Sequence, residues 1–160
     1  MQFKIGNGID IHQLKENIPF IIGGIKIESE FGIDGHSDGD ILLHAIVDAL
    51  LGALAIGDIG TFYPSNDKWK NSDSNFFLIE TLKKLKKENF YISNIDSTII
   101  LQKPKINQYI PQIKQNLQQL MSLESNQISV KATTSDYLGF IGQSKGIAAM
   151  VTVLICKDSK

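Results

Sequence analysis

The segment that begins at Asp38 or Asp40 and ends at Ala55 constrains the fold of this chain more than any other stretch of its sequence. Large aliphatic residues recur there at helical spacing and give a broad apolar face, formed by Leu43, Ile46, Val47, Leu50, Leu51 and Leu54. A helix of this kind gains most of its stability from packing against other elements. The longest nearly continuous apolar run, Ala49–Gly57, is far shorter than the ~20 residues that a membrane-spanning helix needs. We therefore expect a globular protein with this helix in its core and no membrane partner.

Alternating and β-branched segments surround that helix. The patterns predict strands at Phe3–Gln13, at two short runs around Gly23-Gly24 within Pro19–Ile27, and at Phe90–Gln102, Gln127–Ala132 and Gly146–Cys156. They predict further helices at Ser74–Lys87 and Ile106–Met121, and polar loops at Ser29–Asp38, Gly57–Ser72 and Thr133–Ser144. Asp38 is the expected N-cap of the first helix, and Gly57 is its expected end. This order predicts a single α+β domain over residues 1–160, with one mixed β-sheet and helices packed on one face.

The lysines and the acidic residues are distributed unevenly along the chain. Residues 1–67 carry three lysines against ten acidic residues, a net charge of −7, and residues 68–160 carry a net charge of +6. An acidic half suits cations and a basic half suits phosphates. Because the chain contains no arginine, a phosphate site has to use lysine, hydroxyl or backbone N–H groups, or a metal ion. Most of the positive excess lies on one predicted helix, whose solvated face explains it without a nucleic-acid partner: Lys83, Lys84, Lys86 and Lys87.

The three histidines all precede residue 45, and two of them belong to a candidate metal site. Asp10 and His12 are two residues apart on a predicted strand, so their side chains point to the same face. His44 lies on the predicted helix, and the three side chains converge if that helix packs near the strand. Two imidazoles and one carboxylate leave an open fourth position on a tetrahedral Zn²⁺, as in catalytic sites. Asp40 or Asp48, each four residues from His44, is a candidate partner for its second ring nitrogen.

Spacing alone leaves simpler interpretations open. An Asp-x-His pair is common, and a histidine on a helix is more often a partly buried polar residue than a ligand. His36 and Ser37 stand just before a helix N-terminus, where either phosphate binding or simple capping explains them. The single cysteine, Cys156, excludes an intramolecular disulfide and a multi-cysteine zinc site, and it fits a reducing compartment.

Five short motifs, in order along the chain, carry a resemblance to a known family. They are Gly8–His12 (GIDIH), Gly35–Asp40 (GHSDGD) with His44 four residues on, Asp48–Ala53 (DALLGA), Gly57–Gly60 (GDIG) and Lys131–Thr134 (KATT). With them the chain resembles the 2-C-methyl-D-erythritol 2,4-cyclodiphosphate synthases, and the resemblance runs from about residue 3 to residue 157.

The resemblance implies a phosphorus–oxygen lyase of the non-mevalonate isoprenoid pathway. Its reaction would convert 4-diphosphocytidyl-2-C-methyl-D-erythritol 2-phosphate to 2-C-methyl-D-erythritol 2,4-cyclodiphosphate and CMP by intramolecular phosphoryl transfer. The resemblance also implies a homotrimer with active sites between neighbouring subunits. Zn²⁺ would be held by Asp10, His12 and His44, and Mg²⁺ or Mn²⁺ would bridge the diphosphate. The expected location is the bacterial cytoplasm, or a plastid-type organelle after removal of a transit peptide.

The same resemblance assigns roles to single residues. His36 and Thr134 match residues that stabilise the transition state, and Asp136 matches the carboxylate of the second metal ion. Ser37 matches a contact to the erythritol phosphate. The remaining matched positions are expected substrate contacts: Asp58, Ile59 and Gly60 at the ribose; Tyr63, Pro64, Ser65, Asn66 and Asp67 in the methylerythritol loop; Leu101, Gln102, Lys103, Pro104, Lys105, Ile106 and Asn107 in the cytosine pocket; and Thr133, Ser135, Phe140 and Gln143.

The chain departs from the family's usual pattern at three places. Asp136 stands where glutamate is usual, and Ser65 replaces a usual carboxylate of the methylerythritol loop. Gln143 and Lys145 stand near the expected trimer axis in place of arginine and glutamate, which bears on any axial site for an isoprenoid diphosphate. None of these positions belongs to the expected zinc ligands.

Two alternative functions differ in class from the cyclase. A zinc hydrolase would activate water at the open metal position, but no glutamate base stands beside the ligands in the sequence. A trimeric module that binds metal or isoprenoid without catalysis would not need the intact set of Asp10, His12, His44 and Thr134. Product analysis separates the first alternative from the cyclase, and measurable turnover excludes the second.

Overall fold

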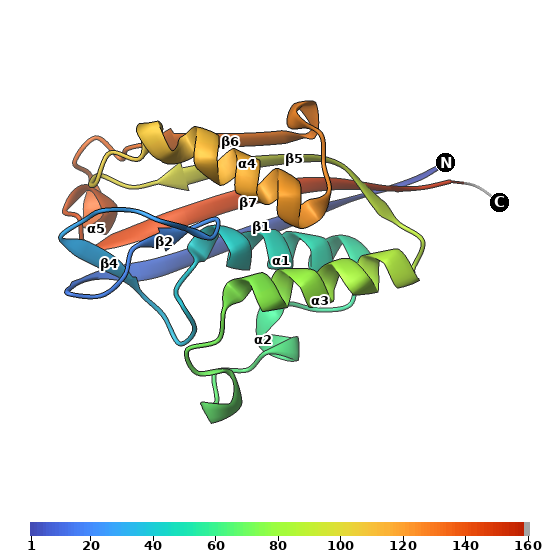
Figure 1. Ribbon diagram of the computed structural model, residues 1–160, viewed down its shortest axis with the longest axis horizontal. Coiled ribbons are helices and arrows are strands. Elements are labelled where there is room, and N and C mark those ends of the chain that lie inside the picture. The colour runs from blue at the N-terminus through green and yellow to red at the C-terminus, as the bar shows by residue number, and fades with distance from the viewer. Residues whose placement is uncertain (159–160) are drawn as a thin grey trace.

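Five strands form one mixed sheet in the computed structural model, which describes residues 1–158 (Figure 1). The strands lie in the order β4 (Phe31–Asp34), β1 (Gln2–Glu16), β7 (Gly146–Lys157), β5 (Tyr91–Ile100) and β6 (Ile128–Thr133). β5 and β6 pair in parallel, and the other neighbouring pairs are antiparallel. A separate ladder of β2 (Ile21–Ile22) and β3 (Ile25–Lys26) confirms the hairpin predicted around Gly23-Gly24.

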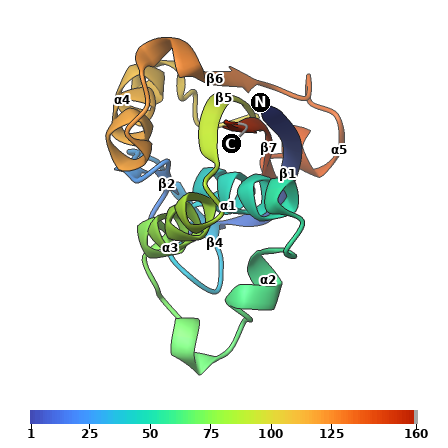
Figure 2. The ribbon, with the colours of Figure 1, turned by 90° about the vertical axis from the view of Figure 1, so that its right-hand side faces the viewer.

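Three long helices lie on one side of this sheet: α1 (Ile41–Leu54), α3 (Ser74–Lys87) and α4 (Ile110–Met121) (Figure 2). Eleven of the fourteen residues of α1 are buried, which makes this helix the centre of the core. The remaining short elements are α2 (Ile59–Phe62), α5 (Gly139–Gly142) and the 3-10 turns η1 (Asp67–Trp69), η2 (Asn107–Tyr109) and η3 (Ser125–Gln127). The prediction of a single α+β domain with helices on one face of a mixed sheet is confirmed.

Helix α1 lies directly on the backbone of β1, and this contact positions the candidate site. Gly6 and Gly8 face the helix, and a methyl group on either would overlap a carbonyl oxygen, that of Ala49 or Ala45. Larger side chains would therefore hold the two elements apart. Because side chains alternate along a strand, the face of β1 that carries these glycines also carries its residues 10 and 12.

The opposite face of β1 carries apolar side chains that residues 1–158 leave uncovered. Ile5, Ile9 and Ile11 are 71%, 53% and 57% exposed. Met150 of β7, which pairs with Ile9, is 44% exposed. Monomeric soluble domains rarely expose a contiguous apolar patch, and such patches mark interaction surfaces.

The predicted helical span, from Asp38 or Asp40 to Ala55, agrees with α1, but the predicted N-cap and the predicted end at Gly57 are wrong. Asp40, not Asp38, is the N-cap, and its carboxylate accepts a hydrogen bond from the Leu43 N–H at 3.1 Å. The helix ends before Ala55, which adopts the left-handed conformation at φ 61°, rather than at Gly57. Both aspartates satisfy the capping pattern in the sequence, and Asp38 is instead engaged by the N-terminus of α3.

The three predicted loops contain short elements that the sequence pattern does not mark. Strand β4 lies within the predicted loop Ser29–Asp38 and pairs with the end of β1. The predicted loop Gly57–Ser72 contains α2 and η1, and the loop Thr133–Ser144 contains α5. Each of these elements has only three or four residues, which is too short to display a helical or alternating period.

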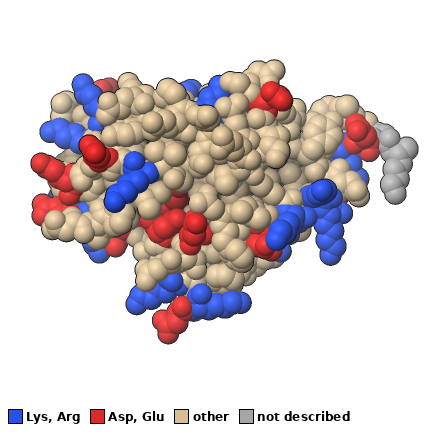
Figure 3. Space-filling model, in the orientation of Figure 1, with Lys and Arg blue, Asp and Glu red and all other residues tan. Residues whose placement is uncertain are grey.

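The uneven charge of the sequence appears on the surface as a lysine cluster where α3 ends (Figure 3). Lys84, Lys86 and Lys87 lie in the last turn, where positive charge interacts favourably with the helix dipole. A solvated helix end therefore accounts for these lysines. None of the helices between residues 1 and 158 has the length and apolar character needed to cross a membrane.

Candidate active site

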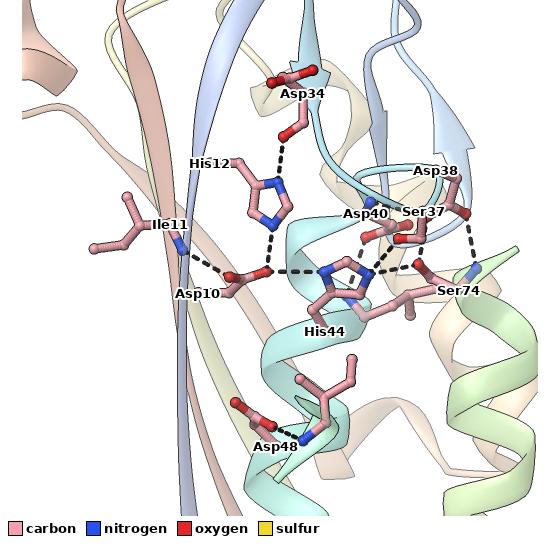
Figure 4. Close-up of polar contacts among 12 residues, drawn as sticks. Asp10, Ile11, His12, Asp34, Ser37, Asp38, Asp40, His44, Asp48 and Ser74 are labelled. Atoms are coloured by element: carbon pink, nitrogen blue, oxygen red, sulfur yellow. Dashed lines mark hydrogen bonds and ion pairs between the residues drawn. The ribbon is translucent and has the colours of Figure 1, made fainter. Parts of the chain in front are cut away.

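Asp10, His12 and His44 meet where β1 contacts α1 (Figure 4). One carboxylate oxygen, Asp10 Oδ2, lies 2.9 Å from His12 Nε2 and 3.0 Å from His44 Nδ1. One ligand atom from each of the three residues lies within 4.8 Å of the other two. The convergence predicted from the spacing is confirmed, and this donor set can hold a metal ion.

The hydrogen bond of His12 to the backbone explains why a cation fits between this imidazole and the Asp10 carboxylate. His12 Nδ1 lies 2.6 Å from the carbonyl oxygen of Asp34, which only accepts, so Nδ1 carries the hydrogen. The lone pair of a neutral His12 is then on Nε2 and faces the Asp10 carboxylate. Two acceptors at this distance need a proton or a metal ion between them. Metal-binding histidines commonly fix their ligating nitrogen through such a second hydrogen bond.

Asp10 supplies the negative charge of the site. Burial raises the pKa of Asp10, but the imidazoles of His12 and His44 beside it outweigh burial and hold that pKa well below its ordinary value. Burial lowers the pKa of His12, but the Asp10 carboxylate outweighs burial and raises that pKa above its ordinary value. An ionised carboxylate beside two oriented imidazoles is a donor set that suits a divalent transition metal.

The carboxylate partners predicted for His44 are wrong. Asp40 is fully buried and accepts three backbone hydrogen bonds, from the N–H groups of Gly23, Gly24 and Leu43. Asp48 accepts a hydrogen bond from the N–H of Ile59 at 2.7 Å, one turn further along α1. The second ring nitrogen of His44 faces two hydroxyl groups instead, those of Ser37 and Ser74.

A cavity of about 220 Å³ opens beside the three ligands. The structure brings six further predicted site residues to its wall: His36, Ser37, Ile59, Gly60, Tyr63 and Ser65. Asp58 caps the adjoining helix α2 by accepting a hydrogen bond from the Thr61 N–H at 2.7 Å. The other members of the predicted methylerythritol loop follow in the chain and are exposed: Pro64, Asn66 and Asp67.

Two aromatic residues that no sequence motif marks, Trp69 and Phe77, complete this wall. Tyr63 contacts both, with ring centroids 5.2 Å from Trp69 and 4.5 Å from Phe77. Phe77 has the spacing of an ordinary core position on its helix. Trp69 is the only tryptophan of the chain and follows the predicted methylerythritol loop, which is the one indication that the sequence offers.

The remaining predicted substrate residues lie elsewhere in the chain, after the ends of β5 and β6. A cavity of about 670 Å³ is lined by Gln102, Lys103, Pro104, Lys105, Thr134 and Asp136, among others. An adjoining cavity of about 180 Å³ adds Leu101, Ile106, Asn107 and Thr133. Ser135, Phe140 and Gln143 lie on the turn that follows, where the Ser135 hydroxyl donates to the Leu138 carbonyl.

These two cavities share no lining residue with the cavity beside His44. The candidate metal ligands come from β1 and α1, whereas Thr134 and Asp136 follow β6. Asp136 adopts the left-handed conformation at φ 49°, and its carboxylate accepts a hydrogen bond from the Thr134 hydroxyl at 3.2 Å. Within the described chain, the predicted site residues therefore form two separate groups.

Comparisons with known proteins agree with this arrangement. A model of the YgbB family matches residues 3–156. The chain is 49% identical over 159 residues to the 2-C-methyl-D-erythritol 2,4-cyclodiphosphate synthase of Francisella philomiragia, covering 97% of this chain and 99% of that protein. It is 47% identical over 156 residues to the synthase of the same name from Geobacillus sp. WCH70, with 97% and 99% covered. The solved structure of IspF from Plasmodium falciparum, a CDP complex, matches with a TM-score of 0.87 and 38% identity, covering 98% of this chain and 97% of that one. The chain therefore belongs to the YgbB family, the 2-C-methyl-D-erythritol 2,4-cyclodiphosphate synthases, which are lyases of the non-mevalonate isoprenoid pathway.

Proposed function

We propose that this protein converts 4-diphosphocytidyl-2-C-methyl-D-erythritol 2-phosphate to 2-C-methyl-D-erythritol 2,4-cyclodiphosphate and CMP. The observation that carries the proposal is the Asp10–His12–His44 ligand set beside a cavity that His36 and Ser37 line, in a chain of this family. An oxygen of the 2-phosphate attacks the β-phosphorus, and the bond from that phosphorus to the oxygen bridging the two phosphates breaks. That oxygen leaves with CMP, an eight-membered ring closes, and no water is consumed.

The residues of the chain act mainly by positioning and by neutralising charge, which are the main requirements of phosphoryl transfer. His36 and Ser37 donate to phosphate oxygens from the loop before α1, and the Thr134 hydroxyl donates from the second group. Ring closure is intramolecular, so holding the two phosphates in line supplies much of the rate. Since the chain has no arginine, hydroxyl, imidazole and backbone donors take the place of guanidinium groups.

Asp10, His12 and His44 would hold Zn²⁺, and Asp136 would hold Mg²⁺ or Mn²⁺. Three protein ligands leave a zinc ion one position for a substrate oxygen, and a single hard carboxylate suits magnesium, which keeps its other positions for water and phosphate. Bound metal ions withdraw negative charge from the phosphate oxygens and so make the phosphorus easier to attack.

The nucleotide end of the substrate is assigned to the second group of residues. A solved relative is a CDP complex, which supports a substrate linked to cytidine diphosphate. The segment Leu101–Asn107 would hold the cytosine, and Thr133, Ser135, Phe140 and Gln143 would lie along the diphosphate. Asp58, Ile59 and Gly60 are assigned to the ribose, and the loop from Tyr63 to Asp67 to the methylerythritol.

We infer that three copies of the chain assemble with each site between two neighbours. The uncovered isoleucines on the outer face of β1 give such an assembly an apolar surface to bury. The two separate groups of site residues support the same arrangement, because one chain would contribute the metal ligands and its neighbour would contribute Thr134 and Asp136.

Phosphorus NMR of the purified protein with the proposed substrate, Zn²⁺ and Mg²⁺ tests the reaction directly. We expect the monophosphate signal to disappear while two coupled cyclic-diphosphate signals and free CMP appear. CMP together with a linear product would replace the proposal by a zinc hydrolase. Absence of turnover with one zinc bound per chain would leave a binding module without catalysis.

A further inference from the structure

His44 Nε2 lies 2.9 Å from two hydroxyl oxygens, Ser37 Oγ and Ser74 Oγ (Figure 4). A neutral imidazole with its lone pair on Nδ1 carries only one hydrogen on Nε2, so the two hydroxyls compete for one donor. The surroundings of each serine decide which of them accepts it and what the other is free to do.

The hydroxyl of Ser74 has a fixed direction. Ser74 is fully buried at the first position of α3, and its Oγ–H donates a hydrogen bond to Asp38 Oδ1. Asp38 Oδ2 accepts the Ser74 backbone N–H at 2.9 Å, and Oδ1 also accepts the Asp40 N–H at 3.1 Å. Because the carboxylate takes the hydroxyl hydrogen, the lone pairs of Ser74 Oγ remain for the hydrogen on His44 Nε2.

Ser37 differs from Ser74 in its surroundings and in the partner of its hydroxyl hydrogen. It lines the cavity beside the metal ligands, and within residues 1–158 its hydroxyl makes no hydrogen bond to a carboxylate. A hydroxyl in that place can accept from His44 only in part and keeps its own hydrogen for a group inside the cavity. Ser37 and Ser74 therefore offer the same nitrogen two different environments.

We propose that Asp38 and Ser74 are positioning residues for the metal ligand His44, acting through the chain Asp38 carboxylate, Ser74 hydroxyl, His44 Nε2–H. This chain keeps the Nδ1 lone pair available to a metal ion held beside Asp10 and leaves the Ser37 hydroxyl hydrogen for a substrate phosphate. The inference rests on the proposed metal site. It extends that site to α3, because Asp38 precedes α1 and Ser74 begins α3, so the contact that joins the two helices also orients the ligand.

The test compares Ser74→Ala with Ser37→Ala, which remove one hydroxyl each from the same nitrogen. Zinc affinity is measured by competition with a chromophoric chelator, and the hydrogen on His44 Nε2 is followed by ¹H–¹⁵N NMR of the zinc-loaded protein. We expect Ser74→Ala to weaken zinc binding roughly ten- to hundredfold and to speed the exchange of the Nε2 hydrogen with water. Ser37→Ala should change zinc affinity less than threefold or so and keep the exchange rate of the parent, since the Asp38–Ser74 chain is intact.

Equal zinc affinities and unchanged His44 spectra in the parent and Ser74→Ala would overturn the inference. Should Ser74→Ala fail to fold, Asp38→Asn removes the charge that directs the hydroxyl, and the same two readouts apply to it. The melting temperature of each metal-free variant distinguishes a positioning role from a purely structural one. A purely structural role would lower the melting temperature and leave the zinc affinity of the folded protein unchanged. If the parent itself binds no zinc, the proposed metal site fails rather than this extension of it.

Discussion

Asp40 is a carboxylate with none of its surface exposed, at the junction of α1 and the β2–β3 hairpin. Burial raises the pKa of Asp40 to about 6, because the loss of hydration outweighs the hydrogen bonds from Gly24, Leu43 and Gly23. The charge of nearby Asp38 raises it further. The N–H groups of the hairpin turn therefore donate to a carboxyl group that is ionised above pH 6 and protonated in moderately acidic solution.

This pKa predicts a specific dependence of stability on pH. The unfolded state releases the Asp40 proton near pH 4, whereas the folded state holds it until about pH 6. Stability contributed by the protonated form is thus fully present below pH 4 and is lost as the pH rises through 6. Relative to Asp40→Asn, we expect the metal-free parent to lose about 2–3 kcal/mol of unfolding free energy across this window.

Urea unfolding at pH 4, 5, 6 and 7 with a chelator present measures this difference. The replacement changes hydrogen bonds at every pH. The prediction therefore concerns only how the difference in unfolding free energy between parent and variant changes with pH. A difference that does not change with pH would mean that Asp40 keeps its ordinary pKa in the folded protein.

At the scale of elements, the contact between α1 and β1 decides where the metal ligands stand. Gly8→Ala would force a methyl group against the Ala45 carbonyl, so the helix has to move away from the strand. We expect a loss of about 3 kcal/mol of stability and a lower zinc affinity, because His44 moves away from Asp10. Chemical unfolding and chelator competition measure the two effects.

Gly52→Ala provides a matched control within α1. The nearest atom to an added methyl there is the Asn7 carbonyl oxygen at 4.0 Å, which is ordinary contact. Alanine in a helix is favoured over glycine by roughly 0.5–1 kcal/mol, so this variant should gain stability and keep its zinc affinity. Equal losses in both variants would show that the close approach of α1 to β1 does not determine the site.

The convergence of Asp10, His12 and His44 could be predicted from the sequence because two periods place them. Asp10 and His12 obey the two-residue period of a strand, and His44 stands on a helix that has to be buried. The hydrogen-bond partners of His44 could not be predicted in this way. Ser74 lies thirty residues further on and reaches His44 only when α3 packs on α1. Sequence spacing favoured Asp40 and Asp48, which packing directs to backbone N–H groups instead. Strand β4 was missed for a related reason: four residues with a glycine among them show no alternation.

At the scale of the whole molecule, two features of the chain have no partner within residues 1–158. The outer face of β1 exposes isoleucine side chains to water, which is unfavourable. The predicted substrate residues are divided between cavities that have no lining residue in common. The proposed trimer would answer both, because contacts between its copies would cover the apolar face and join complementary halves of a site. Light scattering should then give about three times 17.7 kDa.

A mixing experiment tests whether the halves belong to different chains. His44→Ala damages the metal ligands and leaves Thr134 intact, whereas Thr134→Ala does the reverse, and each variant alone should be nearly inactive. In trimers reassembled from an equal mixture, a site is intact when a Thr134→Ala chain supplies its metal ligands and a His44→Ala chain supplies its Thr134. Random assembly makes about a quarter of the sites intact, so the mixture should recover roughly that fraction of the parent's turnover. A mixture as inactive as its components would place the whole site within one chain, and the apolar face of β1 would then need another partner.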